Sequence, residues 1–429
     1  MLLPVLLLLR LVHAQCTAHN SLAFLSPVSS APAITATAVF SNLSSPRGIV
    51  FDSHHNLLVV ERGLGITAFT SSSPTCNGWL RTVVVQNANF TQGLQVHENS
   101  LYVSTSGEVW RYVYDPLSRT VHGGPQVVIN GIPPDGELTT RPILLHPPTN
   151  PSTLLVSCSL ASNIDLTARL PSSGRSQIRS FSLLAPPPQP FFTGTLLAYG
   201  IRNPAAFAFL PSTRLWVVDN GASIDNVTGL TAAFVNDNPA DELNLVDLSD
   251  PAPPAEGRFY GFPDCTTIWN PDADPVGDPQ YTGFERGAQF SLLLEPERGN
   301  AWCQDVKNNV PPRLSFQAHS VPLDLKFFFP TPTTTHSSQS LPHAWAGDAF
   351  VTFHGSFDRT PPTGYAVVRV PFSQSEPAAT AGDTVLVQAS DLATCPGTCI
   401  RPVGLAFSHD GRLFVSSDSS GELFVISAA

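Results

Sequence analysis

A pattern of turn, strand, turn and strand occurs six times along the chain, and it constrains the fold more than any other feature of the sequence. Each copy has a turn that contains Arg, Gly or Pro, then an alternating apolar segment, a polar turn and a second apolar segment rich in Val. Such alternation is typical of β-strands. The first strands of the six copies begin near residues 46, 92, 141, 203, 322 and 402.

Further strand-like segments follow several of these pairs, which gives roughly four strands in each unit, and four-stranded units repeated around an axis form a β-propeller. We therefore predict an all-β fold, a six-bladed β-propeller with long inter-blade loops. About 120 residues separate the fourth and fifth copies, so this interval must hold long insertions such as 223–310. Long ordered insertions on a repeat fold often carry function.

The composition supports the same fold class. The chain has 41 prolines among 429 residues, too many for a helical protein or for many central strands. Its apolar content of 42% is still enough for a large core, which excludes a disordered chain. The formal charge of -11 disfavours nucleic acid as a partner.

The N-terminal segment has the features of a secretory signal peptide. Residues 1–10 are nearly all apolar, and Val12-His13-Ala14 supplies small residues where a signal peptidase cleaves. We predict a signal peptide at 1–14, a single propeller domain at 15–429 and a secreted, extracellular protein. No later segment reaches ~18 uninterrupted apolar residues, so we expect no membrane span. Glycosylation sequons begin at Asn42, Asn89 and Asn226.

Seven cysteines also fit export. Proximity along the chain suggests three disulfides, although the sequence alone leaves the pairing open. Cys158 lies in an apolar run with no basic neighbour, and we predict a buried free thiol there. The suggested pairs are Cys16 with Cys76, Cys265 with Cys303, and Cys395 with Cys399.

The common catalytic motifs are missing from the sequence. Segment 62–68 fits the dinucleotide-binding fingerprint by letter, but a Ser/Pro loop follows where that motif requires a helix, so we interpret it as a turn. There is no Gly-x-Ser-x-Gly elbow, no His-Glu-x-x-His pair and no Walker loop.

Cationic and amide side chains recur where the first strand of a unit begins. The innermost strands of a propeller start at its central channel, so these side chains would converge there. A positive pocket in an acidic protein suits a small polyanion whose carboxylates Arg can hold in a bidentate way. The alternative is that each Arg pairs with a local Asp. The residues are Arg47, Gln92, Arg141, Arg202 with Asn203, His319 and Arg401.

Segment 236–244, Asn-Asp-Asn-Pro-Ala-Asp-Glu-Leu-Asn, concentrates oxygen donors within nine residues. Calcium sites have this composition. A capped turn without metal is the alternative interpretation.

Seven short segments spread over nearly the whole mature chain form a combined pattern: 43–49 (LSSPRGI), 200–204 (GIRNP), 241–244 (DELN), 259–263 (FYGFP), 354–359 (HGSFDR), 361–365 (PPTGY) and 401–407 (RPVGLAF). Together they resemble the secreted fungal pyrroloquinoline-quinone (PQQ) dependent pyranose dehydrogenases and, more distantly, soluble glucose and sorbosone dehydrogenases. The resemblance implies a six-bladed propeller with PQQ and Ca²⁺ at the top of its channel. It also implies oxidation of a sugar hydroxyl, typically at the anomeric carbon, with hydride transfer to PQQ.

The resemblance further implies roles for particular residues. Arg202 and Asn203 would contact the quinone and Arg401 its carboxylates, with Arg47, His319, His354 and Arg359 as neighbours. Carbonyls around Asn238 and Pro239, with Asp241 and Glu242 nearby, would form the Ca²⁺ loop. The partners implied are a small sugar and a separate extracellular electron acceptor: a haem protein, a copper oxygenase or a quinone.

One departure from the family concerns the general base. The family has a His just before the first strand of the third blade, whereas residues 135–141 read Asp-Gly-Glu-Leu-Thr-Thr-Arg. Glu137 could be the base, His97 or His319 could reach in, or the pocket could bind without turnover, and Gln92 could hydrogen-bond substrate. We therefore keep a catalytically impaired, sugar- or quinone-binding propeller as the alternative to an enzyme. A lactonase-type propeller fits less well, because the acidic residues are concentrated in one loop.

Overall fold

The structure is a computed structural model that describes residues 22–71, 79–249, 258–331, 337–378 and 382–429. The predicted signal peptide and the suggested Cys16–Cys76 pair lie outside these residues. In the described part of the chain, no helix is both long and apolar enough to cross a membrane.

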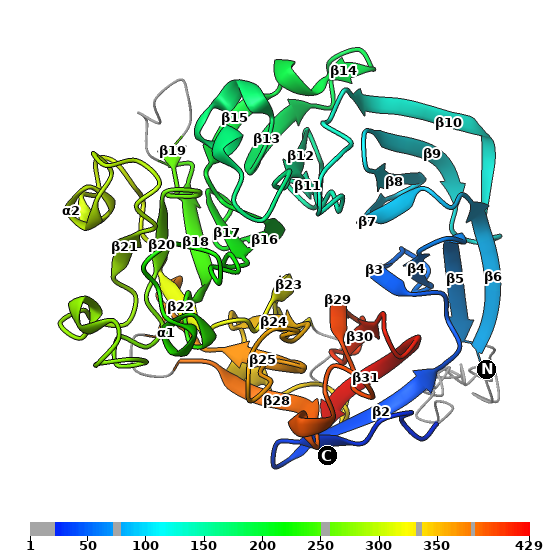
Figure 1. The fold of residues 1–429 in the computed structure, drawn as a ribbon. Coiled ribbons are helices and arrows are strands. Elements are labelled where there is room, and N and C mark those ends of the chain that lie inside the picture. The colour runs from blue at the N-terminus through cyan, green and yellow to red at the C-terminus, as the bar shows by residue number, and fades with distance from the viewer. Residues whose placement is uncertain (1–21, 72–78, 250–257, 332–336, 379–381) are drawn as a thin grey trace, which may run out of the picture.

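Six sheets stand around a central axis, which confirms the predicted all-β, six-bladed propeller (Figure 1). Each predicted strand pair supplies the two innermost strands of one blade. Blade 1 contains β3 (Pro46–Phe51), β4 (Leu57–Glu61), β5 (Gly65–Ser71) and β6 (Trp79–Gln86); blade 2 contains β7 (Phe90–His97), β8 (Ser100–Thr105), β9 (Val109–Asp115), β10 (Thr120–Asn130) and β14 (Gln189–Pro190); blade 3 contains β11 (Ile143–His146), β12 (Thr153–Cys158), β13 (Gln177–Ser182), β15 (Thr195–Tyr199) and β19 (Arg258–Phe259).

The other three blades follow the same order, with the innermost strand first in the chain. Blade 4 contains β16 (Pro204–Phe209), β17 (Arg214–Asp219), β18 (Asp241–Asp247) and β22 (Leu314–Phe316); blade 5 contains β23 (Pro322–Phe327), β24 (Ala349–Phe353), β25 (Ala366–Val370), β28 (Thr384–Ala389) and β1 (Val28–Ser30); blade 6 contains β29 (Pro402–Phe407), β30 (Leu413–Ser417), β31 (Glu422–Ala428) and β2 (Ile34–Phe40).

The second strand of a blade has a continuous apolar centre because neighbouring blades cover both of its faces. In β17, Trp216 and Val218 pack with residues of blade 5, whereas Leu215 and Val217 pack with residues of blade 3. All four side chains are fully buried. Successive side chains of a strand point to opposite faces, so one strand joins two hydrophobic clusters.

N-terminal strands complete the last two blades. The strand β2 pairs antiparallel with β31, and β1 pairs antiparallel with β28. Strands from the two ends of the chain therefore share one sheet in blade 6, which closes the ring (Figure 1).

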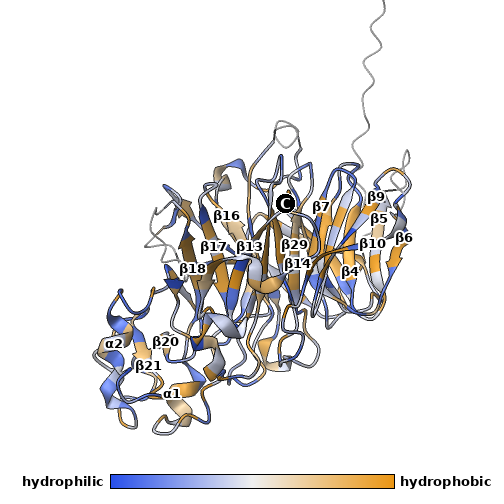
Figure 2. Cartoon of the chain, turned by 90° about the horizontal axis from the view of Figure 1, so that it is seen from above, coloured by the Kyte–Doolittle hydropathy of each residue, from blue (hydrophilic) through white to orange (hydrophobic). Residues whose placement is uncertain are grey.

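The predicted insertion is present as two excursions, before and after β18. They contain α1 (Ala232–Asn236), the hairpin β20 (Cys265–Thr267) with β21 (Gln289–Ser291), and α2 (Asn300–Gln304). These elements project from one face of the propeller (Figure 2), and α1 and β21 contribute Phe234 and Phe290 to one hydrophobic cluster.

Two suggested disulfides are confirmed, Cys265–Cys303 in the insertion and Cys395–Cys399 before blade 6. Cys158 is a buried free thiol, as predicted, and burial raises its pKa. The segment 62–68 is a turn leading into β5, which confirms that it is not a dinucleotide site. A small two-stranded sheet, β26 (Phe372–Ser373) with β27 (Glu376–Pro377), lies outside the blades.

Candidate active site

A cavity of about 600 Å³ lies where the innermost strands begin, on the face that carries the insertion. Most of the predicted site residues border it. They are Arg47, Glu137, Arg202, Asn203, Asp241, His319, His354 and Arg401.

The start of each innermost strand explains this convergence. Arg47 is the second residue of β3, Asn203 directly precedes β16, and Arg401 directly precedes β29. Proline begins β3, β16, β23 and β29, a position that tolerates the missing N–H group. The same local pattern therefore delivers a polar side chain to the channel from several blades.

Arg47 is buried and only partly paired. Its Nη1 contacts Asp418 Oδ2 at 2.5 Å and its Nη2 donates to Gln92 Oε1 at 2.8 Å, while its Nε has no partner among the described residues. Burial lowers the pKa of Arg47, the charge of Asp418 opposes this, and the like charges of Arg62 and Arg401 add to it. An unpaired buried donor next to other cations is an environment that favours an anion.

Gln92 does not border the cavity. Its Nε2 donates to the carbonyl oxygens of Ala205 (3.4 Å) and Leu323 (3.3 Å), and its Oε1 accepts from Arg47. These contacts join blade 2 to blades 1, 4 and 5 across the channel. Gln92 therefore positions Arg47, and the structure does not support the expectation that it meets a substrate.

The guanidinium of Arg202 is surrounded by oxygen atoms. It donates to Asn163 O at 3.1 Å, to Asn163 Oδ1 at 2.9 Å and to Gly221 O at 3.1 Å. The backbone N–H groups of Arg202 and Asn203 donate to Asp219 at 2.9 and 2.6 Å. Burial, together with the charge of Glu242 on the paired strand, raises the pKa of Asp219 to about 8.

Arg401 donates to two carbonyl oxygens, those of His354 (3.1 Å) and Gly355 (2.8 Å), and has no carboxylate partner in the described part of the chain. His354 Nε2 lies 2.8 Å from Asp418 Oδ1. Burial lowers the pKa of His354 although Asp418 opposes the shift. Burial alone would raise the pKa of Asp418, but His354 and Arg47 outweigh it and hold that pKa below its usual range.

The four predicted metal residues do not converge on one point. Asn238 is buried, and its side chain bonds Trp269 N, Asn270 N and two carbonyl oxygens. Glu242 accepts from Thr267 and Asn244. Of the four, which also include Pro239, only Asp241 borders the cavity.

Both oxygens of Asp241 accept backbone N–H groups, from Gly221 at 2.7 Å and from Val321 at 2.6 Å. Asp241 therefore holds together two cavity segments from different blades. His319 and Val321 have φ angles of 63° and 59°, which is unusual for a β-branched residue such as Val321. The bond to Asp241 helps to fix this strained turn.

The loop between β24 and β25 brings three consecutive residues to the site. Phe357 borders the cavity although its side chain is 72% exposed, and Asp358 borders it as well. Arg359 does not border it: its guanidinium contacts Asp237 and the carbonyl oxygens of Asn236 and Pro361. The structure thus makes Arg359 a clamp for the loop, which differs from the expected role beside the cofactor.

Glu137 is exposed at the cavity, and its carboxylate has no partner among the described residues. Leu138 borders the cavity beside it, and one of these two residues falls where the family resemblance suggests a His. His97 lies at the end of β7 beside Glu98 and does not border the cavity. His319 does border it, but both of its ring nitrogens face oxygen atoms.

Four cavity residues were missed as functional candidates: Arg62, Phe357, Asp358 and Asp418. Phe357 and Asp358 lie inside a segment that carries the resemblance, so the sequence held a signal for them. Arg62 follows β4 in the turn dismissed as a dinucleotide motif. Asp418 follows β30, and no local pattern distinguishes it from an ordinary turn residue.

The comparisons agree with this geometry. The chain matches the family described as TrAA12-like over residues 28–429. A PQQ-dependent sugar dehydrogenase of Hypocrea jecorina is 33% identical over 425 residues, covering 96% of this chain and 92% of the relative. A PQQ-dependent pyranose dehydrogenase of Coprinopsis cinerea is 33% identical over 413 residues, covering 90% of this chain but only 53% of the relative.

Among solved structures, the holo form of the PQQ domain of the Coprinopsis cinerea pyranose dehydrogenase has a TM-score of 0.80 and 29% identity, covering 96% of this chain and 99% of that domain. The family match spans nearly the whole described chain, and two relatives exceed 30% identity. The chain belongs to the TrAA12-like family.

Proposed function

We propose that this chain is a secreted, PQQ-dependent dehydrogenase that oxidises a hydroxyl group of a pyranose, at the anomeric carbon. The observation that carries the proposal is the cationic cavity: Arg47, Arg62, Arg202 and Arg401 border one space at the entrance of the channel. The relatives named as PQQ-dependent sugar dehydrogenases support the choice of cofactor and substrate class.

The cavity residues fit a planar tricarboxylate. A volume of about 600 Å³ is in the range of small-molecule sites. Arg47 Nε is a buried donor without a partner in the described chain, and Arg401 lacks a carboxylate partner there. The exposed ring of Phe357 offers an aromatic face against which a flat quinone or the C–H face of a sugar can stack.

PQQ, when bound, supplies an electrophilic quinone that accepts a hydride. The residues of this chain perform the other tasks. Arg401 and Arg47 bind carboxylates, Arg202 stabilises negative charge that develops nearby, and a cavity base accepts the hydroxyl proton. Asp418 and Gln92 hold Arg47 in place for this role.

Calcium dependence stays a prediction from the resemblance, which implies backbone carbonyls around Asn238 and Pro239 as ligands. The side-chain oxygens of Asn238, Asp241 and Glu242 accept hydrogen bonds within the protein. We therefore route no step of the reaction through calcium.

A cavity that binds sugar or quinone without turnover is the second candidate. The absence of His from segment 135–141 favours it, because Leu138, one of the two residues that fall where the family has a His, cannot accept a proton. The electron acceptor in the proposed function is a separate molecule, such as an extracellular haem protein, a copper oxygenase or a diffusible quinone.

The test is a titration of the purified, metal-stripped protein with PQQ, with and without Ca²⁺, followed by melting temperature. A panel of pyranoses and an artificial electron acceptor is then added. Stabilisation by PQQ followed by reduction of the acceptor is the expected result. Stabilisation without reduction favours the second candidate, and no stabilisation by PQQ contradicts the proposed cofactor.

A further inference from the structure

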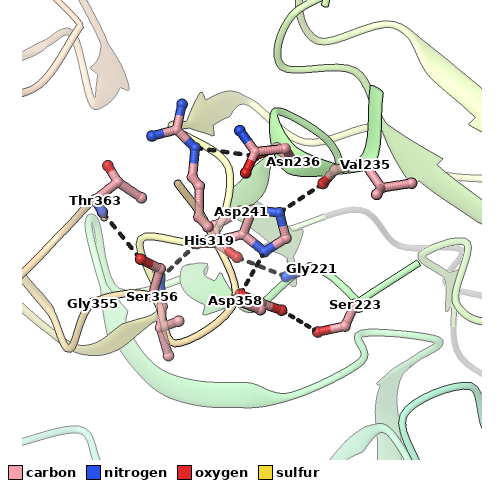
Figure 3. Close-up of polar contacts among 12 residues, drawn as sticks. Gly221, Ser223, Val235, Asn236, Asp241, His319, Gly355, Ser356, Asp358 and Thr363 are labelled. Atoms are coloured by element: carbon pink, nitrogen blue, oxygen red, sulfur yellow. Dashed lines mark hydrogen bonds and ion pairs between the residues drawn. The ribbon is translucent and has the colours of Figure 1, made fainter. Parts of the chain in front are cut away.

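Three cavity residues form a chain of polar contacts that the proposed function has not yet used (Figure 3). Ser223 Oγ donates to Asp358 Oδ2 at 2.8 Å. Asp358 Oδ1 lies 3.4 Å from His319 Nδ1, and His319 Nε2 lies 3.0 Å from the carbonyl oxygen of Val235. The side chains of Asp358 and His319 are 15% and 8% exposed, so they form part of the cavity wall.

The contact with Val235 fixes the tautomer of His319. A carbonyl oxygen can only accept a hydrogen bond, so Nε2 must carry the proton in that contact. In the neutral imidazole, the second ring nitrogen, Nδ1, then has a lone pair that faces Asp358. The Nδ1–Oδ1 separation of 3.4 Å is longer than the ~2.7–2.9 Å of a charge-assisted hydrogen bond. The Asp358–His319 pair can therefore accept one additional proton.

We infer that Asp358 is the general base of the proposed reaction and that His319 receives the proton from it. The inference rests on the proposed function. The substrate O–H bond breaks and its proton passes to Asp358 and then to His319 Nδ1; as the C=O bond forms, PQQ, when bound, would supply the acceptor for the hydride from the same carbon. The Asp358–His319 pair changes from a net charge of -1 to zero, and the proton later leaves to solvent.

The surrounding residues hold this pair in place. Arg359, next in sequence, contacts Asp237, which fixes the loop that carries Asp358. The hydroxyl of Tyr365 contacts the carbonyl oxygen of Ser356 in the same loop. Ser223 bonds one oxygen of Asp358 and leaves the other facing His319. Ser223 is therefore a positioning residue, whereas Asp358 touches the substrate.

Glu137 lacks these features. It borders the cavity, but its carboxylate has no partner in the described chain that could orient it or take the proton onward. The structure thus shifts the role of base from the residue suggested by sequence position to a residue on blade 5.

The decisive experiment compares Asp358→Asn, Glu137→Gln and Asp272→Asn in the full chain loaded with PQQ. Asp272 is an exposed carboxylate outside the cavity and serves as the matched control. We expect Asp358→Asn to lower kcat by about 10²–10⁴-fold, the usual contribution of a general base, while PQQ affinity stays within about threefold. We expect the fall in kcat caused by Glu137→Gln to be at least about tenfold smaller than the fall caused by Asp358→Asn.

A second readout needs neither PQQ nor turnover. Nitrogen-15 NMR of the cofactor-free protein, with His319→Gln to assign the signal, should show a protonated Nε2 and an unprotonated Nδ1 on His319.

An unprotonated Nε2 contradicts the inference, as does turnover in Asp358→Asn that matches the control. Protein that binds PQQ but oxidises no sugar contradicts the proposed function and the base together, whereas active wild type with an active Asp358→Asn variant contradicts only the base.

Discussion

The guanidinium groups of Arg47, Arg202 and Arg401 differ in the groups that already neutralise them. Arg47 has the carboxylate of Asp418, and the charges of Asp219 and Asp241 act on Arg202. In the described part of the chain, Arg401 contacts carbonyl oxygens and the ring of Tyr365 but no carboxylate. Carbonyl dipoles orient a cation without cancelling its charge, so Arg401 has the most charge available for a ligand.

Arg401→Lys is expected to weaken PQQ binding by ~10–100-fold, because Lys keeps the charge but loses the planar fork, and a hydrogen bond to a charged group is worth about 1.5–3 kcal/mol. Isothermal titration with PQQ measures this. Arg286→Lys is the matched control, since Arg286 is exposed and lies outside the cavity. Equal losses in the two variants would contradict the role of Arg401.

Asp219 provides a prediction about pH. Its pKa is raised to about 8 because it is buried and faces the charge of Glu242. An acid whose folded-state pKa is raised contributes stability that is complete below its ordinary pKa and is lost as pH rises through the folded value. Between pH 6 and pH 9 the wild type should therefore lose stability relative to Asp219→Asn. Guanidinium unfolding at several pH values tests this, and parallel curves for the two proteins would contradict it.

At the scale of single residues, the sequence was a reliable guide to which side chains reach the channel and a poor guide to their partners. Arg47 and Arg401 follow from strand starts, which are local. The contacts Arg47–Asp418 and Asp358–His319 join segments more than 35 residues apart, and no spacing rule predicts such pairs. The partners of the Asn238 side chain were not predicted for the same reason, because the backbone N–H groups of Trp269 and Asn270 bind it.

Elements differ in how far local sequence determined them. The innermost strand pairs of all six blades were predicted, because apolar alternation and turns specify them locally. The strands β19 and β14 were not, since each has only two residues and depends on pairing with β15 and β10. The loop between β24 and β25 is determined by a local network in which Ser356 and Thr363 exchange hydrogen bonds.

The loop between β24 and β25 requires a glycine at position 355. Its φ is +93°, and a Cβ atom built there would lie 2.6 Å from the ring of Tyr365. Gly347 has a similar φ of +85° but open space around it. Gly355→Ala should therefore cost more stability than Gly347→Ala by about 1–3 kcal/mol, and it should also weaken sugar turnover because Phe357 and Asp358 shift. Denaturant midpoints and kcat/KM measure the two effects, and equal stability losses would show that the ring of Tyr365 moves aside freely.

On the scale of the whole molecule, the propeller depends on contacts between the two ends of the chain. The strand β2 is the outer strand of blade 6, and its residues Ala38 and Val39 are fully buried. Sequence repeats predicted the number of blades but not this closure, because the first repeat begins after β2. Radial folds must satisfy the edges of the last blade, and an N-terminal strand does so here.

A chain that begins at Ser41 should therefore be less stable than one that begins at Gln15, because it lacks β1 and β2 and leaves β31 with an unpaired edge. Burial of a Val or Ile side chain contributes about 1.5–3 kcal/mol, so loss of Ile34 and Val39 should lower the melting temperature by roughly 5–10 °C.

A synthetic peptide of residues 26–41 added in excess should restore most of that loss by pairing with β31. A peptide with Ala38 and Val39 both replaced by Asp is the control and should restore nothing. If the shortened chain melts like the longer one, closure by β2 does not stabilise the ring, and the packing between neighbouring blades must suffice.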